Sequence, residues 1–318
     1  MIIGGIFLAL LLLGMPIGFA IGLTGLAGLV SMGGERFLAL GVTKLFSGLD
    51  SFPFLAMPFF ILAGEIMNHI GITNQLMRLA HVLVRHFRGG LAQANMVASV
   101  MFAGLTGAAT ADAAAFGKTL VPEMVKTGYR RDYACAVTAA GSIIGPTIPP
   151  SGLMVVYGSL LGVSIGGLFA AGILPGLAIC LVCMVIIALG AKRNKLPSPE
   201  PRASLREIAR QTLSSTAALL MPVIILGGIL GGIFTPTEAA AMAVLAALLV
   251  GLLVTRRFSI LDLPDIILTA AKRTSVVLLM VATSFAFGWL LANQGIPQKI
   301  AETMVGLTDN RYLLMFFI

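Results

Sequence analysis

A cluster of prolines interrupts the apolar run between residues 133 and 163, and it is the strongest constraint on how this chain can fold. The cluster, Gly-Pro-Thr-Ile-Pro-Pro, occupies residues 145–150. Proline lacks a backbone N–H and clashes with the preceding helical turn, so the sequence predicts two half-helices separated by extended backbone. Unpaired backbone groups cost several kcal/mol each in hydrocarbon, so such a break indicates a protein-lined site for an ion or substrate. A proline kink that only bends a helix is the alternative.

The composition of the chain indicates a polytopic membrane protein. Of its 318 residues, 58% are hydrophobic and only 11% are charged, and the mean hydropathy is +1.00. Soluble domains carry about 25% charged residues. The 21 lysines and arginines, which contribute to a formal net charge of +8, gather in a few loops, as the positive-inside rule predicts for membrane topology. We therefore expect a lipid bilayer around the chain and no nucleic-acid partner.

The distribution of basic residues predicts a re-entrant hairpin. Residues 3–31 and 53–70 each read as one spanning helix, and an apolar stretch of about 91–124 follows. Basic residues flank this stretch on both sides: Arg78, Arg85, Arg88, Lys126, Arg130 and Arg131. Since positive loops face the cytoplasm, the stretch must enter and leave from one side as two helices too short to span about 30 Å. Its tip is expected at residues 104–110, where small residues suit a tight turn.

A weak internal repeat predicts inverted copies of one architecture. Matches recur at a nearly constant offset: Pro16 with Pro236, Arg36-Phe37 with Arg257-Phe258, and Gly71-Ile72-Thr73 with Gly295-Ile296-Pro297. A connecting span between the copies gives the second copy the opposite orientation, as is typical of transporters. The fold class is therefore expected to be an all-α polytopic membrane protein with inverted repeats, a re-entrant hairpin and broken helices.

The repeat also predicts how the chain divides. Residues 1–191 are expected to form the first repeat, with its scaffold spans, the hairpin at about 91–124 and the broken helix at about 133–163. Residues 192–211 are expected to be a basic cytoplasmic linker, and residues 212–318 the connecting span and the start of the second repeat. By symmetry a second hairpin would begin at Asp309 and be truncated at Ile318, with roughly 100 residues to follow.

The hairpin tip and the proline cluster together form the predicted site. Backbone carbonyls and hydroxyls with few carboxylates suit a monovalent cation such as Na⁺, which we expect as the coupling ion. The predicted sodium ligands are Thr106, Gly107, Ser142, Gly145, Thr147, Pro149 and Pro150. Half-helix N-termini favour an anionic substrate, which Thr110, Asp112 and Ser151 are predicted to face. The alternative role of Asp112 is to cap the second hairpin helix, and the two roles can coexist.

No motif points to enzyme chemistry, so neither catalytic residues nor a cofactor other than Na⁺ is expected. Gly117-Lys118-Thr119 lacks the first glycine of a phosphate-binding loop. His69, His81 and His86 show no zinc-ligand spacing. An intramembrane aspartyl protease would need a pair of aspartates, and Asp112 has no second acid near it in the sequence.

Several motifs resemble one transporter family. They are residues 102–117 (FAGLTGAATADAAAFG), 141–152 (GSIIGPTIPPSG), 232–240 (GIFTPTEAA) and the opening 14–18 (GMPIG). Together they resemble the large membrane subunit of tripartite ATP-independent periplasmic (TRAP) transporters of the dicarboxylate and sialic acid type, over essentially the whole chain. The resemblance implies an elevator-type, sodium-coupled symporter in the bacterial inner membrane that imports small organic anions such as C4-dicarboxylates, sialic acid, or other sugar or keto acids.

The resemblance also implies two protein partners, a small membrane subunit and a periplasmic substrate-binding protein that delivers the anion. The family's usual serine-rich hairpin tip is Leu-Thr-Gly-Ala-Ala here, which favours carbonyl over side-chain coordination. The family also ends with a second hairpin and a second Pro-Pro broken helix beyond the sequence given. Two alternatives remain open: a sodium- or proton-coupled organic anion symporter of related architecture that needs no binding protein, and a channel or intramembrane enzyme.

Overall fold

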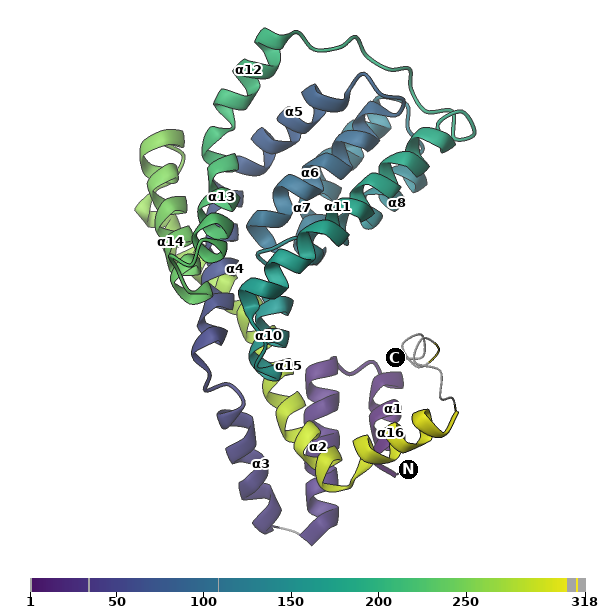
Figure 1. Ribbon diagram of the computed structural model, residues 1–318, viewed down its shortest axis with the longest axis vertical. Helices are drawn as coiled ribbons and strands as arrows, with labels where there is room; N and C mark the ends of the chain where they lie inside the picture. The colour runs from purple at the N-terminus through teal and green to yellow at the C-terminus, as the bar shows by residue number, and fades with distance from the viewer. Residues whose placement is uncertain (1, 34, 108, 308–312, 314–318) are drawn as a thin grey trace. The chain divides into compact units, whose positions relative to one another are not determined.

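The computed structural model describes residues 2–33, 35–107, 109–307 and 313, and every regular element in this part of the chain is a helix (Figure 1). Helices satisfy all their backbone groups internally, as a bilayer requires. The described helices that are long and apolar enough to cross a membrane are Arg131–Leu161, Ile165–Gly190, Pro236–Thr255 and Ile260–Asn293, and two bent pairs would raise the number from four to six. The prediction of an all-α polytopic membrane protein is confirmed.

The chain divides into two compact units, Met1–Ser51 with Ser275–Ile318, and Phe52–Thr274. The first unit contains α1 (Ile2–Leu12), α2 (Ile17–Gly33), α3 (Glu35–Ser47), the later part of α15 (Leu263–Asn293) and α16 (Ile296–Leu307). The prediction of one helix over residues 3–31 is wrong. Gly14, at φ +78°, and Pro16 turn the chain between α1 and α2, because the left-handed glycine ends one helix and proline starts the next.

A row of glycines lines α2 where it packs against α15. A Cβ added at Gly22 would lie 3.0 Å from Cγ2 of Thr283, and one added at Gly18 would lie 3.3 Å from Cγ of Met280. Gly25 and Gly28 continue the row against Phe287 and Leu290. Small residues at this spacing let two helix backbones approach closely, which favours helix association in lipid.

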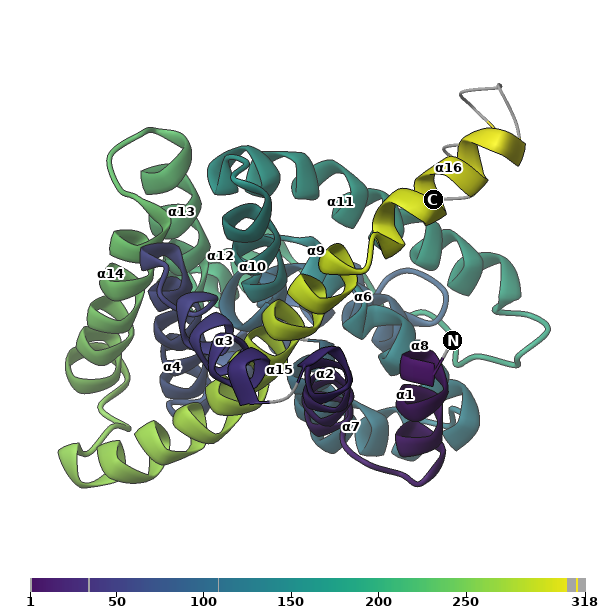
Figure 2. The ribbon, with the colours of Figure 1, turned by 90° about the horizontal axis from the view of Figure 1, so that it is seen from below.

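The second unit starts with a 3₁₀ turn, Phe52–Leu55, and holds most of the helices. They are α4 (Ala56–His69), α5 (Ile72–Val84), α6 (Gly90–Thr106), α7 (Ala109–Lys126), α8 (Arg131–Ser142), α9 (Ile144–Thr147), α10 (Gly152–Leu161), α11 (Ile165–Gly190), α12 (Leu205–Ser214), α13 (Thr216–Leu230) and α14 (Pro236–Leu249). α4 lies along α14 in both views (Figures 1 and 2). α14 contains several buried alanines, including Ala239 and Ala243.

The two units pair their helices in the same crosswise way. In the first unit, α2 of the first predicted copy packs on α15 of the second copy, and in the second unit α14 of the second copy packs on α4 of the first. The helices α5 and α16 each begin after a left-handed glycine, Gly71 at φ +80° and Gly295 at φ +65°. The predicted repeat boundaries and the opposite orientation of the copies stay predictions.

The predicted hairpin is present as two helices joined at Gly107. α6 and α7 have 17 and 18 residues, and the rings of Phe102 and Phe116 meet across them with centroids 5.2 Å apart. Gly107 adopts φ +57°, in the left-handed region that favours glycine. The structure therefore places the turn inside the predicted tip, while re-entry from one side of a membrane stays a prediction.

The proline cluster breaks its helix as predicted. Regular helix ends at Thr147, the backbone of Ile148 and Ser151 is extended, and α10 resumes at Gly152. The predicted linker, residues 192–211, differs from expectation, because α12 begins within it at Leu205. The Ser204 hydroxyl accepts a hydrogen bond of 3.2 Å from the backbone N–H of Glu207 and caps this helix.

Candidate functional site

The hairpin tip lies directly against the break in the proline-rich helix. A Cβ added at Gly107 would collide with the carbonyl oxygen of Pro150 and would lie 3.0 Å from Cα of Ser151. The packing contacts of α6 and α7 with α9 bring the rest of the hairpin to the same helix. The structure thus brings together the two segments that the sequence assigned to one site, through backbone contact that only glycine permits.

Two glycines of α11 hold the other side of the break. A Cβ added at Gly172 would lie 2.6 Å from the carbonyl oxygen of Thr147, and Gly176 packs against the side chain of Ile148. Consequently the carbonyls of Thr147 and Pro150 contact different neighbours, α11 and the hairpin tip. Of the two, the Pro150 carbonyl is the one beside Gly107, where the predicted ion would lie.

Two hydroxyls of the broken helix, those of Ser142 and Thr147, have lone pairs that could bind a cation. Ser142 donates its proton to the carbonyl of Ala139 at 2.8 Å, and Thr147 donates to the carbonyl of Ile143 at 2.9 Å. Since each hydroxyl donates within its own helix, its lone pairs remain for a cation. Ser151 is fully buried, and its Oγ has no hydrogen-bond partner among the described residues. A buried hydroxyl without a partner costs about 1–3 kcal/mol, which favours a bound ion, water or substrate there.

The remaining predicted site residues differ in their surroundings. Gly107, Gly145, Pro149 and Pro150 are buried. Asp112 is also buried, in the first turn of α7, whereas Thr110 is exposed, so these two residues do not share one environment. The side chain of Thr106 lies outside the described residues. The assignment of sodium-binding and substrate-facing residues therefore stays a prediction.

The donor set suits a hard monovalent cation better than a transition metal. Among the described residues, no group of three or more histidine, cysteine, aspartate or glutamate side chains could hold a metal ion. The polar atoms near the break are carbonyl and hydroxyl oxygens, which are ligands of Na⁺ in transporters built from discontinuous helices.

A buried polar contact between α6 and α8 was missed by the sequence analysis. The amide of Asn95 donates to Oγ1 of Thr138 at 2.8 Å, and Ser99 donates to the carbonyl of Asn95 at 2.9 Å. A Cβ added at Gly141 would lie 2.8 Å from Oγ of Ser99. All three polar side chains are nearly or fully buried. An amide in an apolar run, as at Asn95, is the signal that could have identified the contact.

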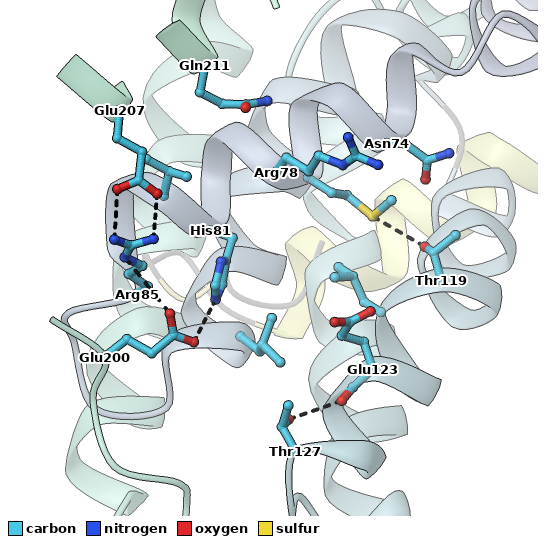
Figure 3. Close-up of a pocket in the computed structure, with 14 residues that line it drawn as sticks. Asn74, Arg78, His81, Arg85, Thr119, Glu123, Thr127, Glu200, Glu207 and Gln211 are labelled. Atoms are coloured by element: carbon cyan, nitrogen blue, oxygen red, sulfur yellow. Dashed lines mark hydrogen bonds and ion pairs between the residues drawn. The ribbon is translucent and has the colours of Figure 1, made fainter. Parts of the chain in front are cut away.

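The base of the hairpin, at the other end of α6 and α7, borders a charged pocket of about 720 Å³ between α5, α7 and α12 (Figure 3). Arg85 donates two hydrogen bonds to the Glu207 carboxylate, at 2.7 and 2.9 Å. His81 faces Glu200 at 3.3 Å. Arg78, Asn74 and Gln211 also line this pocket (Figure 3). Sequence reasoning used these basic residues only for topology.

Comparison with known proteins identifies the family of the chain. Residues 5–318 match the family described as tripartite ATP-independent periplasmic transporter, DctM component. The chain is 39% identical to the sialic acid TRAP transporter large permease protein SiaM of Vibrio cholerae, covering 99% of the chain and 74% of SiaM. It is 38% identical to the C4-dicarboxylate large permease DctM of Pseudomonas aeruginosa, covering 93% of the chain and 69% of that relative.

The name of a third relative mentions a different acid. The 2,3-diketo-L-gulonate TRAP transporter large permease protein YiaN of Escherichia coli is 38% identical, covering 98% of the chain and 74% of YiaN. All three relatives are permeases rather than enzymes, which confirms the prediction that the chain is not an enzyme. The chain belongs to the DctM family, the large permease component of TRAP transporters.

Proposed function

We propose that this chain is the large membrane subunit of a sodium-coupled symporter that imports small organic anions. The observation that carries the proposal is the contact of the hairpin tip, at Gly107, with the backbone of Pro150 and Ser151. That contact joins two chain breaks at one buried point, and irregular backbone at membrane depth is retained where an ion or substrate satisfies it.

The chemistry of the break supports an ion and an anion side by side. A sodium ion would lie between the tip and the proline cluster, held by backbone oxygens and by hydroxyl lone pairs of Ser142 and Thr147. The N-terminus of α10, at Gly152, is the positive end of a half-helix, and it would attract a carboxylate. Na⁺ next to this helix end would add a second positive charge, so ion and anion would bind more tightly together than apart.

The substrate class is a small carboxylic acid. The names of the relatives mention sialic acid, C4-dicarboxylates and 2,3-diketo-L-gulonate, all of which are anions at neutral pH. We infer that a periplasmic substrate-binding protein delivers the acid to this subunit in the bacterial inner membrane, and that a small membrane subunit completes the assembly. The hairpin and the broken helix would move as one body past the scaffold, in an elevator-type cycle.

Uptake into proteoliposomes tests the proposal. The protein, co-reconstituted with its small membrane subunit, is expected to take up a labelled organic acid only when an inward sodium gradient and the binding protein are both present. Uptake driven by a proton gradient alone would contradict sodium coupling. Sodium-driven uptake without binding protein would favour the alternative, a symporter of related architecture that needs no delivery protein.

Variants of the break test the ion site. Each lost oxygen ligand is expected to cost on the order of 1 to 3 kcal/mol, or about one to two decades of sodium affinity. Thr106→Ala and Thr147→Ala should therefore raise the sodium concentration for half-maximal uptake. Pro150→Ala should raise it more, because a helix could close through the gap. Unchanged sodium dependence in all three variants would leave the cluster as a hinge without an ion.

A further inference from the structure

Helix α12 has an apolar edge that no described residue covers. Leu205, Ala209 and Leu213 follow one another at intervals of four, so they lie along one edge of the helix. Leu205 is 85% exposed and Leu213 is 76% exposed, and Ala209 is exposed as well. The opposite edge is committed to α5, since Glu207 binds Arg85. The helix is held at its other edge, so the leucine row stays exposed. Such an exposed apolar row is typical of a surface that contacts a protein or a membrane.

Two arginines border the apolar edge. Arg206 and Arg210 each follow a residue of the row by one position, and both are exposed. Arg210 also lines a groove of about 380 Å³ between α5 and α12, where Arg78 lines the facing wall. Glu207 lines this groove too, but both its carboxylate oxygens accept hydrogen bonds from Arg85. Arg78 and Arg210 have no ion-pair partner among the described residues.

The orientation of α12 fits the surface of a membrane. The helix bends by 63° into α13, and Ser215, at the bend, is buried and donates a 3.3 Å hydrogen bond to the carbonyl of Gln75. α13 is strongly apolar over Thr216–Leu230. If α13 runs roughly along the bilayer normal, with the usual tilt of about 20°, α12 lies closer to the membrane plane than to the normal. An amphipathic helix in that orientation buries its apolar edge at the boundary of headgroups and acyl chains.

We propose that α12 is an interfacial anchor that binds an anionic phospholipid, with Leu205, Ala209 and Leu213 in the acyl region and Arg78 and Arg210 on the headgroup phosphate. A lipid occupant is favoured over a protein, because a row of three side chains is far smaller than the roughly 800 Å² per partner of a specific protein interface. The arginine border complements the negative surface of a cytoplasmic leaflet. This surface is separate from the hairpin tip, so the proposal stands independently of sodium coupling.

Lipid binding by purified protein tests the groove lined by Arg78 and Arg210. Phosphatidylglycerol is titrated into the protein in neutral detergent, and the bound lipid is counted by native mass spectrometry, with phosphatidylcholine as the zwitterionic comparison. Arginines near a membrane surface attract anionic lipid, so Arg78→Gln with Arg210→Gln should weaken phosphatidylglycerol binding about tenfold or more. Binding of phosphatidylcholine should be weak in both proteins.

The matched control removes the same charge from the segment between α11 and α12. Lys192→Gln with Arg193→Gln lowers the net charge by the same amount, outside the groove and α12, and should leave phosphatidylglycerol binding within about twofold of the wild type. Equal losses in both double variants would overturn the proposal, since unspecific charge would then explain the binding. Equal affinity for the two lipids in the wild type would overturn it as well.

The position of the leucine row is tested by spin labels in nanodiscs. A nitroxide at Leu213→Cys, in a background without Cys135, Cys180 and Cys183, should collide with oxygen more often than with a water-soluble nickel chelate. A nitroxide at Ser214→Cys, which lines the groove, should show the reverse preference. A label at position 213 that is open to the nickel chelate would overturn the proposal. A label shielded from both quenchers only when the small membrane subunit is present would assign the row to a protein interface instead.

Discussion

The two ends of the α6–α7 hairpin are built on different principles. At the tip, Gly107 contacts the backbone of Pro150 and Ser151, and these three residues are buried. At the base, a pocket of about 720 Å³ is lined by arginines, glutamates and a histidine, and the paired side chains remain partly exposed. One end depends on shape and backbone oxygens, and the other depends on charges that water and salt can screen.

This difference predicts how each end responds to mutation. A methyl group added at a close-packed backbone contact forces the neighbouring backbone to shift, because interiors are packed with little free volume. A charge removed from a solvated pair costs little, because water replaces the lost partner. The tip should therefore be intolerant of small changes, and the base tolerant of large ones.

The largest effect is expected for Gly107→Ala. The left-handed backbone alone costs about 1–2 kcal/mol for a residue with a Cβ, and the collision with the Pro150 carbonyl adds to it, for a total of about 2–4 kcal/mol. Sodium-driven uptake should be lost, and the apparent melting temperature in detergent should fall by several degrees.

Gly117→Ala is the matched control for that prediction. Gly117 lies in α7 of the same hairpin, and a Cβ added there would meet no atom within 4 Å. Alanine is favoured over glycine within a helix by about 1 kcal/mol, so this variant should keep full uptake and an equal or higher melting temperature. A Gly107→Ala protein that transports as well as Gly117→Ala would refute the close contact at the tip.

A smaller effect with opposite signs in two measurements is expected for Ser151→Ala. Removing a buried hydroxyl that has no described partner should stabilise the protein by about 1 kcal/mol. The same change should raise the KM for the organic acid about tenfold, since the predicted substrate-facing hydroxyl is gone. Thermal unfolding and uptake kinetics on one preparation give both values.

Ser164→Ala provides the contrast for Ser151→Ala. The Ser164 hydroxyl caps α11 by accepting a 3.1 Å hydrogen bond from the backbone N–H of Gly167, so its loss should destabilise by about 1 kcal/mol. Uptake should keep its normal KM. If Ser151→Ala behaves like Ser164→Ala in both measurements, Ser151 is a structural residue and does not face the substrate.

At the base, a double-mutant cycle of Arg85→Gln and Glu207→Gln should give a coupling free energy of about 1 kcal/mol. The pair is bidentate and Arg85 is only 18% exposed, which places it near the upper end for surface ion pairs. The coupling should shrink in high salt. A coupling well above that of a surface pair, and unaffected by salt, would mean that the base is as dry as the tip.

The smallest effect is expected for the exposed pair Arg130 and Asp132. Their side chains are 75% and 64% exposed, so a cycle of Arg130→Gln and Asp132→Asn should give less than about 0.5 kcal/mol. Both pairs are measured by denaturation under the same conditions. A coupling free energy as large as that of Arg85 with Glu207 would show that the strength of these ion pairs does not increase with burial.

Backbone chemistry made some elements predictable from the sequence. Pro149 and Pro150 stand together directly after Ile148, and the helix breaks at these expected residues. The hairpin turn at Gly107 falls inside the expected small-residue segment. Both features depend on local restrictions of φ and on a missing N–H, which act whatever the tertiary surroundings are.

Other features were not predicted, some because hydropathy hides a local signal and some because they depend on distant partners. Residues 3–31 are apolar throughout, and hydropathy alone does not reveal that Gly14 and Pro16 turn the chain. The contact of Asn95 with Thr138 requires knowing which helices pack together. Helix α12 lies in a segment whose prolines and charges resemble a linker, and its capping serine, Ser204, was the available signal.

The crosswise pairing of helices has a consequence for the order of synthesis. The glycine row of α2 leaves the ribosome early, but its partner in α15 is made only after the whole second unit. A translocon inserting the chain vectorially must therefore release α2 into lipid with Gly18, Gly22 and Gly28 still facing acyl chains. The packing of α2 can therefore be completed only after α15 has been inserted. The first unit is expected to reach its final packing late in synthesis rather than step by step.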